Sequence, residues 1–319
     1  WILKSILMVT NLDNKRVFKD VNYIHPPLVF DDDLWGYEFD LYDKDFDIKK
    51  KYEDTISLYE KEFKSFSDYA NERMFLTSIL SDYFKKQWDM RRKIDLKALF
   101  DGKQENFKGL EDNHSYLTID EECAAMQTSE IIGLTGDKSW KDFFRMYTSS
   151  ELLINSKRMR VDIAKNCNEA IAAPYNTMVM MRILDDNVPI MKLLNENNIK
   201  LTNVLNDEFM WDITGKEELF KPFVTEKATI NGIKIHIGVF TFNRIWYKDI
   251  DNNIKSFGVR TDYVTGRKKY HIYKNPLFPQ FVKLAHDLPI EEKDLYYPTG
   301  LEFDKFEKPI ERTESPESE

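Results

Sequence analysis

Residues 201–213 have the sequence LTNVLNDEFMWDI. Two short apolar runs, Leu201–Leu205 and Phe209–Ile213, flank the polar residues Asn206, Asp207 and Glu208. Polar turn residues between two β-prone runs predict a tight β-hairpin. The hairpin would carry Asp207 and Glu208 at its tip.

A second acidic position follows another short apolar run. Residues 115–119 predict a buried strand that ends at Asp120, and residues 121–130 predict the start of a helix. A carboxylate at such a junction faces the mouth of a cavity rather than the core. If this strand and the hairpin are neighbours in one sheet, Asp120 and the pair Asp207–Glu208 can approach closely.

Clustered carboxylates suit hard cations such as Mg²⁺ or Mn²⁺, which prefer oxygen ligands and share their coordination with substrate phosphates. The predicted metal ligands are Asp120 and Asp207. The alternative is structural: Asp120 caps the following helix and Asp207 supplies turn chemistry.

The rest of the chain predicts an α+β protein. Residues 1–50 look extended and aromatic, with a strand near 2–10 and a solvated turn at Asp31–Asp33. Apolar residues recur at the helical period from Asp54 to about Lys93. A capping box at residues 148–151 starts a helix towards Ala172 that stops near Pro174. The predicted division is a helical N-terminal region (1–110), a core (111–215), a β-rich unit (216–308) and a disordered tail (309–319).

The charge, the cysteine count and the apolar runs of the chain limit the partners and surroundings that it can have. The 319 residues carry a net charge of −9, with a pI near 5.3, so nucleic acid would need a local basic patch. The two cysteines form no disulfide framework, and no apolar run is long enough to cross a membrane. The first residues are too short an apolar block for a signal peptide. A cytoplasmic protein is expected, in the host cytoplasm if a phage encodes it.

Two familiar signatures are absent. Residues 133–139 lack the glycine–lysine adjacency of a phosphate-binding loop. The five histidines never stand at zinc-ligand spacing with one another or with cysteine, and His236, between Ile235 and Ile237, is expected on the solvent side of a strand.

One segment combines basic and aromatic residues. Between Lys255 and Asn275, six basic side chains face a single acidic one, and tyrosines are interleaved with them. Cations neutralise phosphates while aromatic rings stack on bases, so a nucleic-acid-binding hairpin is predicted around Gly266. Exposed hairpins also carry lysines to prevent edge aggregation, which is the alternative. The predicted nucleic-acid-binding residues are Arg260, Arg267, Lys268, Lys269, Tyr270 and Lys274.

The order of these motifs resembles the palm of single-subunit, family A-like DNA polymerases, phage forms especially. In that family an aspartate ends a strand, a basic helix follows, and a histidine–aspartate–glutamate hairpin comes last. Asp120 and the run Asn206–Glu208 stand in the first and last places, with asparagine instead of histidine. Between them, residues 157–175 resemble the nucleotide-contacting helix, which would place a triphosphate near Arg158 and Lys165. The alternative for this helix is a solvent face with i,i+4 ion pairs.

The resemblance implies a palm-like α/β core and a divergent nucleotidyltransferase. Asp120 and Asp207 would hold two divalent ions, Glu208 would assist, and the basic hairpin would hold template or product. Two other functions stay open. One is a non-catalytic nucleic-acid-binding or replication accessory protein, and the other is a phage structural or interaction subunit that binds protein partners.

Overall fold

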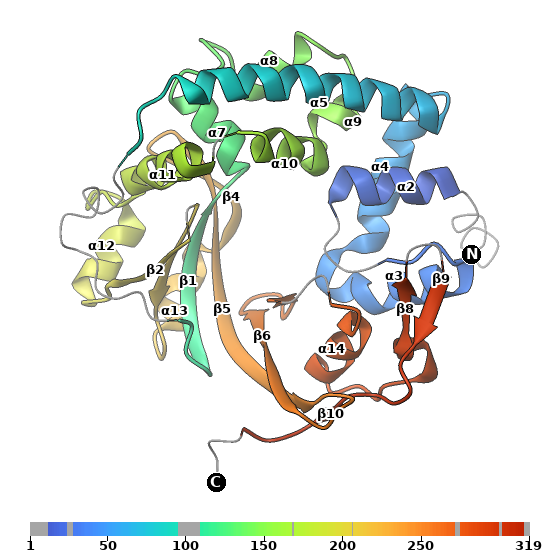
Figure 1. Cartoon of the computed structure of the whole chain (residues 1–319). Helices are drawn as coiled ribbons and strands as arrows, with labels where there is room; N and C mark the ends of the chain where they lie inside the picture. The colour runs from blue at the N-terminus through green and yellow to red at the C-terminus, as the bar shows by residue number, and fades with distance from the viewer. Residues whose placement is uncertain are drawn as a thin grey trace. The chain divides into compact units, whose positions relative to one another are not determined.

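The computed structural model describes residues 12–23, 28–94, 109–167, 169–205, 207–271, 275–299 and 302–315. These residues form helices and a mostly antiparallel sheet, which confirms the predicted α+β class (Figure 1). The chain divides into two compact units. The first contains Trp1–Glu62, Asn243–Thr261 and Gly266–Glu319, and the second contains Phe63–Phe242 and Asp262–Thr265. Both units join segments that are distant in sequence, whereas the predicted ranges are consecutive.

The N-terminal part of the first unit is helical. Its helices are α2 (Leu12–Asn22), α3 (Asp32–Phe46) and α4 (Ile48–Glu62). The prediction of an extended region was therefore wrong for the described part of residues 1–50, and the predicted strand near 2–10 lies outside the described residues.

The acidic run explains where α3 begins. The Asp31 side chain accepts hydrogen bonds from the N–H groups of Asp33 and Leu34, both at 3.1 Å, and so caps the helix. Asp32 and Asp33 then lie in the first turn, where the helix dipole favours negative charge. The run is a helix start and not a solvated turn.

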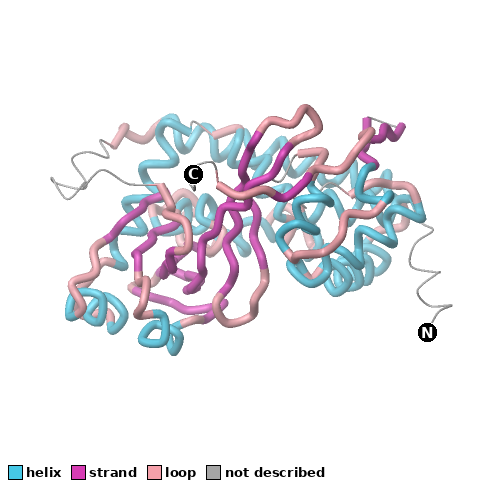
Figure 2. Tube along the Cα trace, turned by 90° about the horizontal axis from the view of Figure 1, so that it is seen from below, coloured by secondary structure: helices cyan, strands magenta, loops and turns pink. Residues whose placement is uncertain are grey.

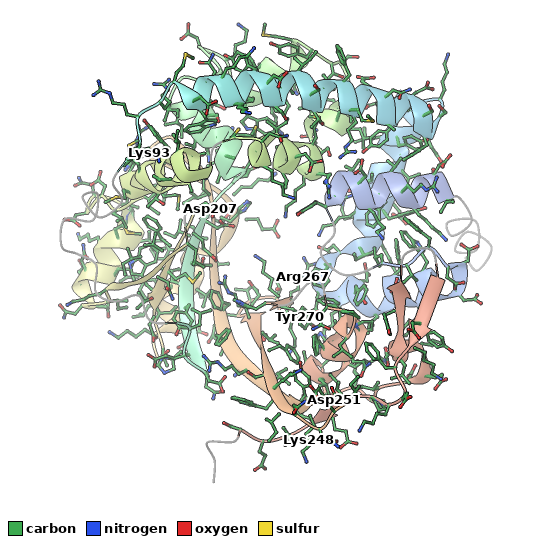
Figure 3. The ribbon with its side chains drawn as sticks, viewed as in Figure 1. Lys93, Asp207, Lys248, Asp251, Arg267 and Tyr270 are labelled. Atoms are coloured by element: carbon green, nitrogen blue, oxygen red, sulfur yellow. The ribbon has the colours of Figure 1, made fainter. Side chains whose placement is uncertain are left out.

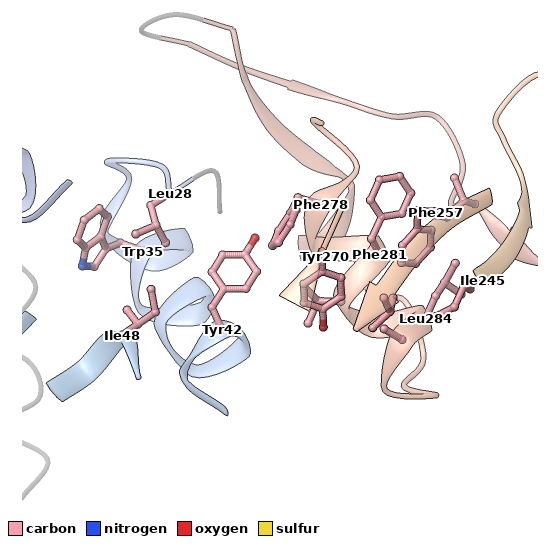
Figure 4. Close-up of a cluster of buried hydrophobic side chains, with 14 of the residues drawn as sticks. Leu28, Trp35, Tyr42, Ile48, Ile245, Phe257, Tyr270, Phe278, Phe281 and Leu284 are labelled. Atoms are coloured by element: carbon pink, nitrogen blue, oxygen red, sulfur yellow. The ribbon is translucent and has the colours of Figure 1, made fainter. Parts of the chain in front are cut away.

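Aromatic side chains make up half of the buried residues in the first unit's core (Figure 4). Trp35 and Tyr42 of α3 are buried, and Tyr42 lies edge-on to Phe278 with ring centroids 5.5 Å apart. Phe278 begins α14 (Phe278–Ala285), whose residues are all buried. The predicted β-rich C-terminal unit thus contains a helix that completes this core, and η3 (Glu292–Leu295) follows it.

A buried polar network lies beside the aromatic core. The Asp45 carboxylate is fully buried and accepts hydrogen bonds from the Tyr270 hydroxyl at 2.7 Å and the Lys268 N–H at 2.9 Å. His286 Nε2 lies 2.8 Å from the same carboxylate. Burial alone would raise the pKa of Asp45, but the hydrogen bonds from His286, Tyr270 and Lys268 outweigh it and hold the pKa below its usual value.

The strands of the first unit extend almost to the end of the described chain. They are the second part of β5 (Ile233–Lys248), β6 (Ile254–Asp262), β7 (Lys268–Tyr270) and β10 (Glu311–Arg312), with a separate pair β8 (Tyr296–Thr299) and β9 (Glu302–Lys305). β6 and β7 pair antiparallel, as the prediction of a hairpin around Gly266 requires. The predicted disordered tail is corrected at its start, because Ile310 is buried and β10 pairs with β5.

The helices of the second unit lie around its sheet. They are α5 (Phe66–Asp89), α7 (Ala124–Ile131), α8 (Trp140–Arg145), α9 (Glu151–Ile154), α10 (Lys157–Lys165), α11 (Glu169–Met180), η1 (Met181–Ile183), α12 (Pro189–Glu196), α13 (Glu217–Phe220) and η2 (Lys221–Phe223). The helical period over residues 54–93 predicts one long helix or a helical pair, and the structure has a pair, α4 and α5, each in a different unit.

The helix predicted from residue 151 to residue 172 is in fact three helices. The predicted capping box begins at Thr148, but Ser150 caps α9 instead, by accepting the Leu153 N–H at 3.1 Å. Ser156 then caps a new helix, α10, by accepting the Met159 N–H at 3.2 Å. Pro174 lies inside α11 instead of ending a helix, at the cost of one backbone hydrogen bond.

The sheet of the second unit has the strand order β2–β3–β1–β5, and β4 also pairs with β5 (Figure 2). The added strands are β1 (His114–Glu121), β2 (Leu201–Leu205), β3 (Glu208–Asp212) and β4 (Thr225–Ile230). β2 and β3 pair antiparallel with Leu205 opposite Glu208, which confirms the predicted hairpin. β1 confirms the predicted strand at 115–119.

One face of this sheet is apolar and covered by helices. It presents Ile119 of β1, Phe209 of β3 and Ile237 of β5, all buried. Residues of α11 and α12, such as Val179 and Ile190, belong to the same core cluster. Since side chains alternate between faces along a strand, Asp120 and Glu208 point to the opposite face.

Among the helices of the described residues, none has both the length and the apolar composition needed to span a membrane.

Replacing Asp45 by asparagine should destabilise the protein by about 3–5 kcal/mol at pH 7, because it breaks a buried, charge-assisted network. The folded pKa of Asp45 lies below the unfolded value, so its contribution is present above about pH 4 and is lost as the pH falls through the folded pKa. Urea unfolding at several pH values should therefore show the difference from wild type shrinking below pH 4. The exposed Asp40 of the same helix provides the control Asp40→Asn, which should cost little. A pH-independent difference would contradict the prediction.

Candidate functional site

The three predicted acidic residues are brought to one end of two neighbouring strands. β1 and β3 pair antiparallel with Asp120 directly opposite Glu208. The Glu121 N–H donates to the Asp207 carbonyl oxygen at 2.9 Å, which closes the ladder at the hairpin turn. The strand and the hairpin are therefore neighbours in one sheet, which is the arrangement that a carboxylate cluster requires. Figure 3 labels Asp207 at this end of the sheet.

The hydrogen-bond pattern makes the contact between Asp120 and Glu208 close. Glu121 bonds to Asp207, and antiparallel ladders alternate between hydrogen-bonded and non-hydrogen-bonded pairs, so Asp120 and Glu208 form a pair of the second kind. Cα atoms in such pairs are about 4.5 Å apart, and their side chains share one face. Like charges in this position destabilise a sheet, which makes the pair a candidate for function.

Thr118 and Gly238 position Glu208. The Thr118 hydroxyl donates to Glu208 Oε1 at 2.7 Å. Gly238 of β5 is the cross-strand partner of Thr118, and a Cβ at Gly238 would lie 3.2 Å from Thr118 Cγ2. The glycine thus leaves space for the threonine that holds the carboxylate.

His236 extends the acidic pair into a row across three strands. It is the β5 partner of Asp120, so Glu208, Asp120 and His236 lie side by side on one face. The alternation of isoleucines correctly predicts that His236 lies on the face opposite the core. The sequence has no signal for its pairing with Asp120, because the register between β1 and β5 is a tertiary contact.

Glu121 adds a buried carboxyl group on the other face of β1. It is 3% exposed and accepts hydrogen bonds from Gln127 Nε2 and Thr128 Oγ1, both at 3.3 Å. Burial, helped by the charges of Asp207 and Asp120, raises the pKa of Glu121 to about 8 despite these hydrogen bonds. Burial, followed by the charge of Glu208, also raises the pKa of Asp207 above its usual value.

Both pKa shifts arise first from burial, and the neighbouring carboxylates are the smaller cause. In the described part of the chain, no three His, Cys, Asp or Glu side chains converge in a group that could hold a metal ion. Two carboxylates with substrate phosphates as further ligands form the donor set that Mg²⁺ commonly uses, and Asp120 and Asp207 fit that set in chemical type. The residues are thus compatible with a cation that arrives with its substrate.

Arg158 and Lys165 lie at the two ends of α10. Arg158 Nε donates to Asp162 Oδ2 at 2.9 Å, and Arg73 of α5 donates to the same oxygen at 2.8 Å. The i,i+4 ion pair that the sequence left open as an alternative is therefore present. Lys165 is exposed at the last turn of α10, and Glu169 belongs to the next helix, α11.

Much of the predicted basic hairpin is turned towards its own unit. Both terminal guanidinium nitrogens of Arg267, Nη1 and Nη2, lie 2.6 Å from the Asp47 carboxylate, and Arg260 Nε donates to His271 at 3.0 Å. Burial lowers the pKa of Lys268. Lys269 is exposed and remains available to a phosphate.

Tyr270 is the clearest departure from the hairpin prediction. Its ring is fully buried beside Phe46 and Phe278, and its hydroxyl bonds to Asp45; Figure 4 shows Tyr270 next to Phe278. The burial leaves no ring face for stacking on a base, so that predicted role is corrected. Lys274 lies outside the described residues.

Comparison of the chain with protein-family models, with curated proteins and with solved structures gave no match.

The contact between Gly238 and Thr118 predicts an energetic coupling. Gly238→Ala should destabilise the protein by about 1–3 kcal/mol, because its Cβ crowds the Thr118 methyl group. Thr118→Ser removes that methyl group but keeps the hydroxyl that bonds to Glu208, so the double variant should recover most of the loss. Urea unfolding of the four proteins measures the coupling as a double-mutant cycle. Additive effects would show that the glycine is not needed for this packing.

Proposed function

We propose that this chain is a divergent nucleotidyltransferase with a polymerase-palm-like core that acts on nucleic acid. The observation that carries the proposal is the register of β1 and β3, which sets Asp120 opposite Glu208 and Asp207 at the adjoining turn. Acidic residues from two segments more than 80 positions apart thereby meet at one end of a sheet whose other face is covered by helices.

The proposed roles follow from the chemistry of the side chains. Asp120 and Asp207 would hold two divalent ions, Mg²⁺ or Mn²⁺, and Glu208, held by Thr118, would assist them. Bound ions of this kind stabilise the attacking and leaving oxygens of phosphoryl transfer. The raised pKa of Asp207 means that a cation must compete with a proton for this carboxylate, so occupancy should increase with pH.

The triphosphate is assigned to the basic helix α10. Lys165 is exposed at its last turn, and Arg158 would have to exchange Asp162 for a phosphate. Since Arg73 also bonds to Asp162, that carboxylate keeps a partner when Arg158 leaves. Arg158 would thus replace one charge-assisted hydrogen bond, to a carboxylate, by another of similar kind, to a phosphate.

A second candidate is a non-catalytic nucleic-acid-binding or replication accessory protein. The ion pair of Arg158 with Asp162 favours it, because this pair occupies the group assigned to the triphosphate. In that case the acidic row would be a remnant with no catalytic role, and the exposed Lys269 would contribute to binding.

The decisive experiment is incorporation of labelled nucleotide on a primed template with Mg²⁺ or Mn²⁺. Asp207→Ala should reduce incorporation by about 100-fold or more, because the proposed ligand is lost from the reacting centre. Asp120→Asn should have an effect of similar size.

The control is Glu196→Gln, which neutralises a solvent-exposed carboxylate on α12 in the same unit. It should retain wild-type incorporation. No activity in any protein, combined with salt-dependent binding of nucleic acid, would favour the accessory protein. Equal incorporation by wild type and Asp207→Ala would reject the catalytic role of this site.

A further inference from the structure

A groove lined mostly by polar side chains lies on the second unit, between α5 and the end of α10. None of its lining residues belongs to the acidic row, which is formed by Glu208, Asp120 and His236. Its volume is about 400 Å³, which is in the range of small-molecule sites. α5 runs alongside α10 in Figure 1. The groove is lined by Arg73, Met74, Thr77, Ser78, Ser81, Asp82, Lys85 and Asn166.

The lining side chains come from one stripe of α5. Arg73, Thr77, Ser81 and Lys85 are spaced four residues apart, so they follow one another along the same face of the helix. Asn166 approaches this stripe from the C-terminal end of α10 and donates from Nδ2 to the Ser81 hydroxyl oxygen at 3.1 Å. Because Ser81 accepts this bond, its own hydroxyl hydrogen can point elsewhere.

The groove is rich in hydrogen-bond donors. Three hydroxyl groups, a guanidinium and an ammonium line it, together with Met74 and the methylene groups of the longer side chains. Phosphate oxygens accept several hydrogen bonds at once and bind arginine through paired N–H groups. A donor-rich site of this kind suits a phosphate better than an apolar ligand.

The local charge also favours an anion. Arg73 and Arg158 both donate to Asp162 Oδ2, so two guanidinium groups share one carboxylate. Within the lining itself, two cationic side chains, Arg73 and Lys85, stand beside one carboxylate, Asp82, in a chain whose net charge is −9. The Arg73 side chain is only 19% exposed, and partial burial strengthens its attraction for an anion.

We propose that this groove binds the phosphate group of a nucleotide, either free or within a nucleic-acid backbone. The inference goes beyond the proposed function, since it uses none of the carboxylates of the acidic row. Arg73 and Lys85 supply positive charge, and Ser78 and Ser81 donate hydroxyl groups to the phosphate oxygens. Asn166 orients Ser81 through their hydrogen bond.

Calorimetric titration of the full chain with AMP, with inorganic phosphate and with an eight-nucleotide single strand tests the proposal. The double variant Lys85→Gln/Ser78→Ala changes two exposed side chains of the groove and should leave the fold intact. Loss of one charged and one neutral donor should weaken binding of AMP by about tenfold or more. Lys85→Arg should retain most of the affinity.

The matched control is Lys86→Gln, which removes the same charge from the neighbouring exposed position of α5, outside the groove. Its affinity should stay within about twofold of wild type, since a long-range charge effect alone is small at physiological salt. Equal weakening by Lys86→Gln and by the double variant Lys85→Gln/Ser78→Ala would overturn the proposal, as would the absence of binding by both AMP and the oligonucleotide.

Two further outcomes separate the sources of the phosphate and the two sites. Tighter binding of the single strand than of AMP, with a steep dependence on salt, assigns the groove to a nucleic-acid backbone, and the opposite order assigns it to a free nucleotide. Asp207→Ala should leave AMP affinity unchanged. Loss of AMP binding in that variant would place the ligand at the acidic row and reject the groove.

Discussion

The pairing of β1 with β3 is the constraint on which the candidate chemistry depends. A shift of this register by one residue would move Asp120 to the face that packs against α11 and α12 and would expose Ile119. Burial of the apolar face therefore sets the position of the acids on the other face. The hydrophobic residues determine where the charged ones stand, and the close contact between Asp120 and Glu208 is a consequence of that packing.

The acidic end of the sheet is electrostatically unfavourable, and its surroundings compensate only in part. Thr118 donates to Glu208, while Gln127 and Thr128 donate to Glu121. The pKa values of Glu121 and Asp207 nevertheless remain raised. A bound cation would stabilise the ionised form of these buried carboxylates, and this links the geometry to the proposed phosphoryl transfer.

The basic residues of the chain behave differently from the acidic ones. Arg267 pairs with Asp47, Arg158 with Asp162, and the hairpin tyrosine Tyr270 is buried on Asp45. These cations find carboxylates of their own unit, so a basic cluster in the sequence does not by itself define a basic surface. Arg73, which lines the groove on α5, differs because it shares the Asp162 carboxylate with Arg158.

The sequence alone determined the local elements whose signals are strong. Alternation and turn residues identified the strand ending at Asp120 and the hairpin at Asp207, and the helical period identified the pair α4 and α5. Reasoning from the sequence failed where a single capping residue decides the outcome, as at Asp31 and Ser156. It also failed for Tyr270, whose hydroxyl donates to Asp45, a residue 225 positions away in the sequence.

The tertiary structure decided which of these elements meet. The row of Glu208, Asp120 and His236 requires two strand registers, and the groove on α5 requires helices separated by more than 60 residues to pack together. No local rule contains that information, because each register or helix contact is selected by the fit of the whole apolar core. The sequence supplied the acids at two strand ends, and the packing of the core made them neighbours.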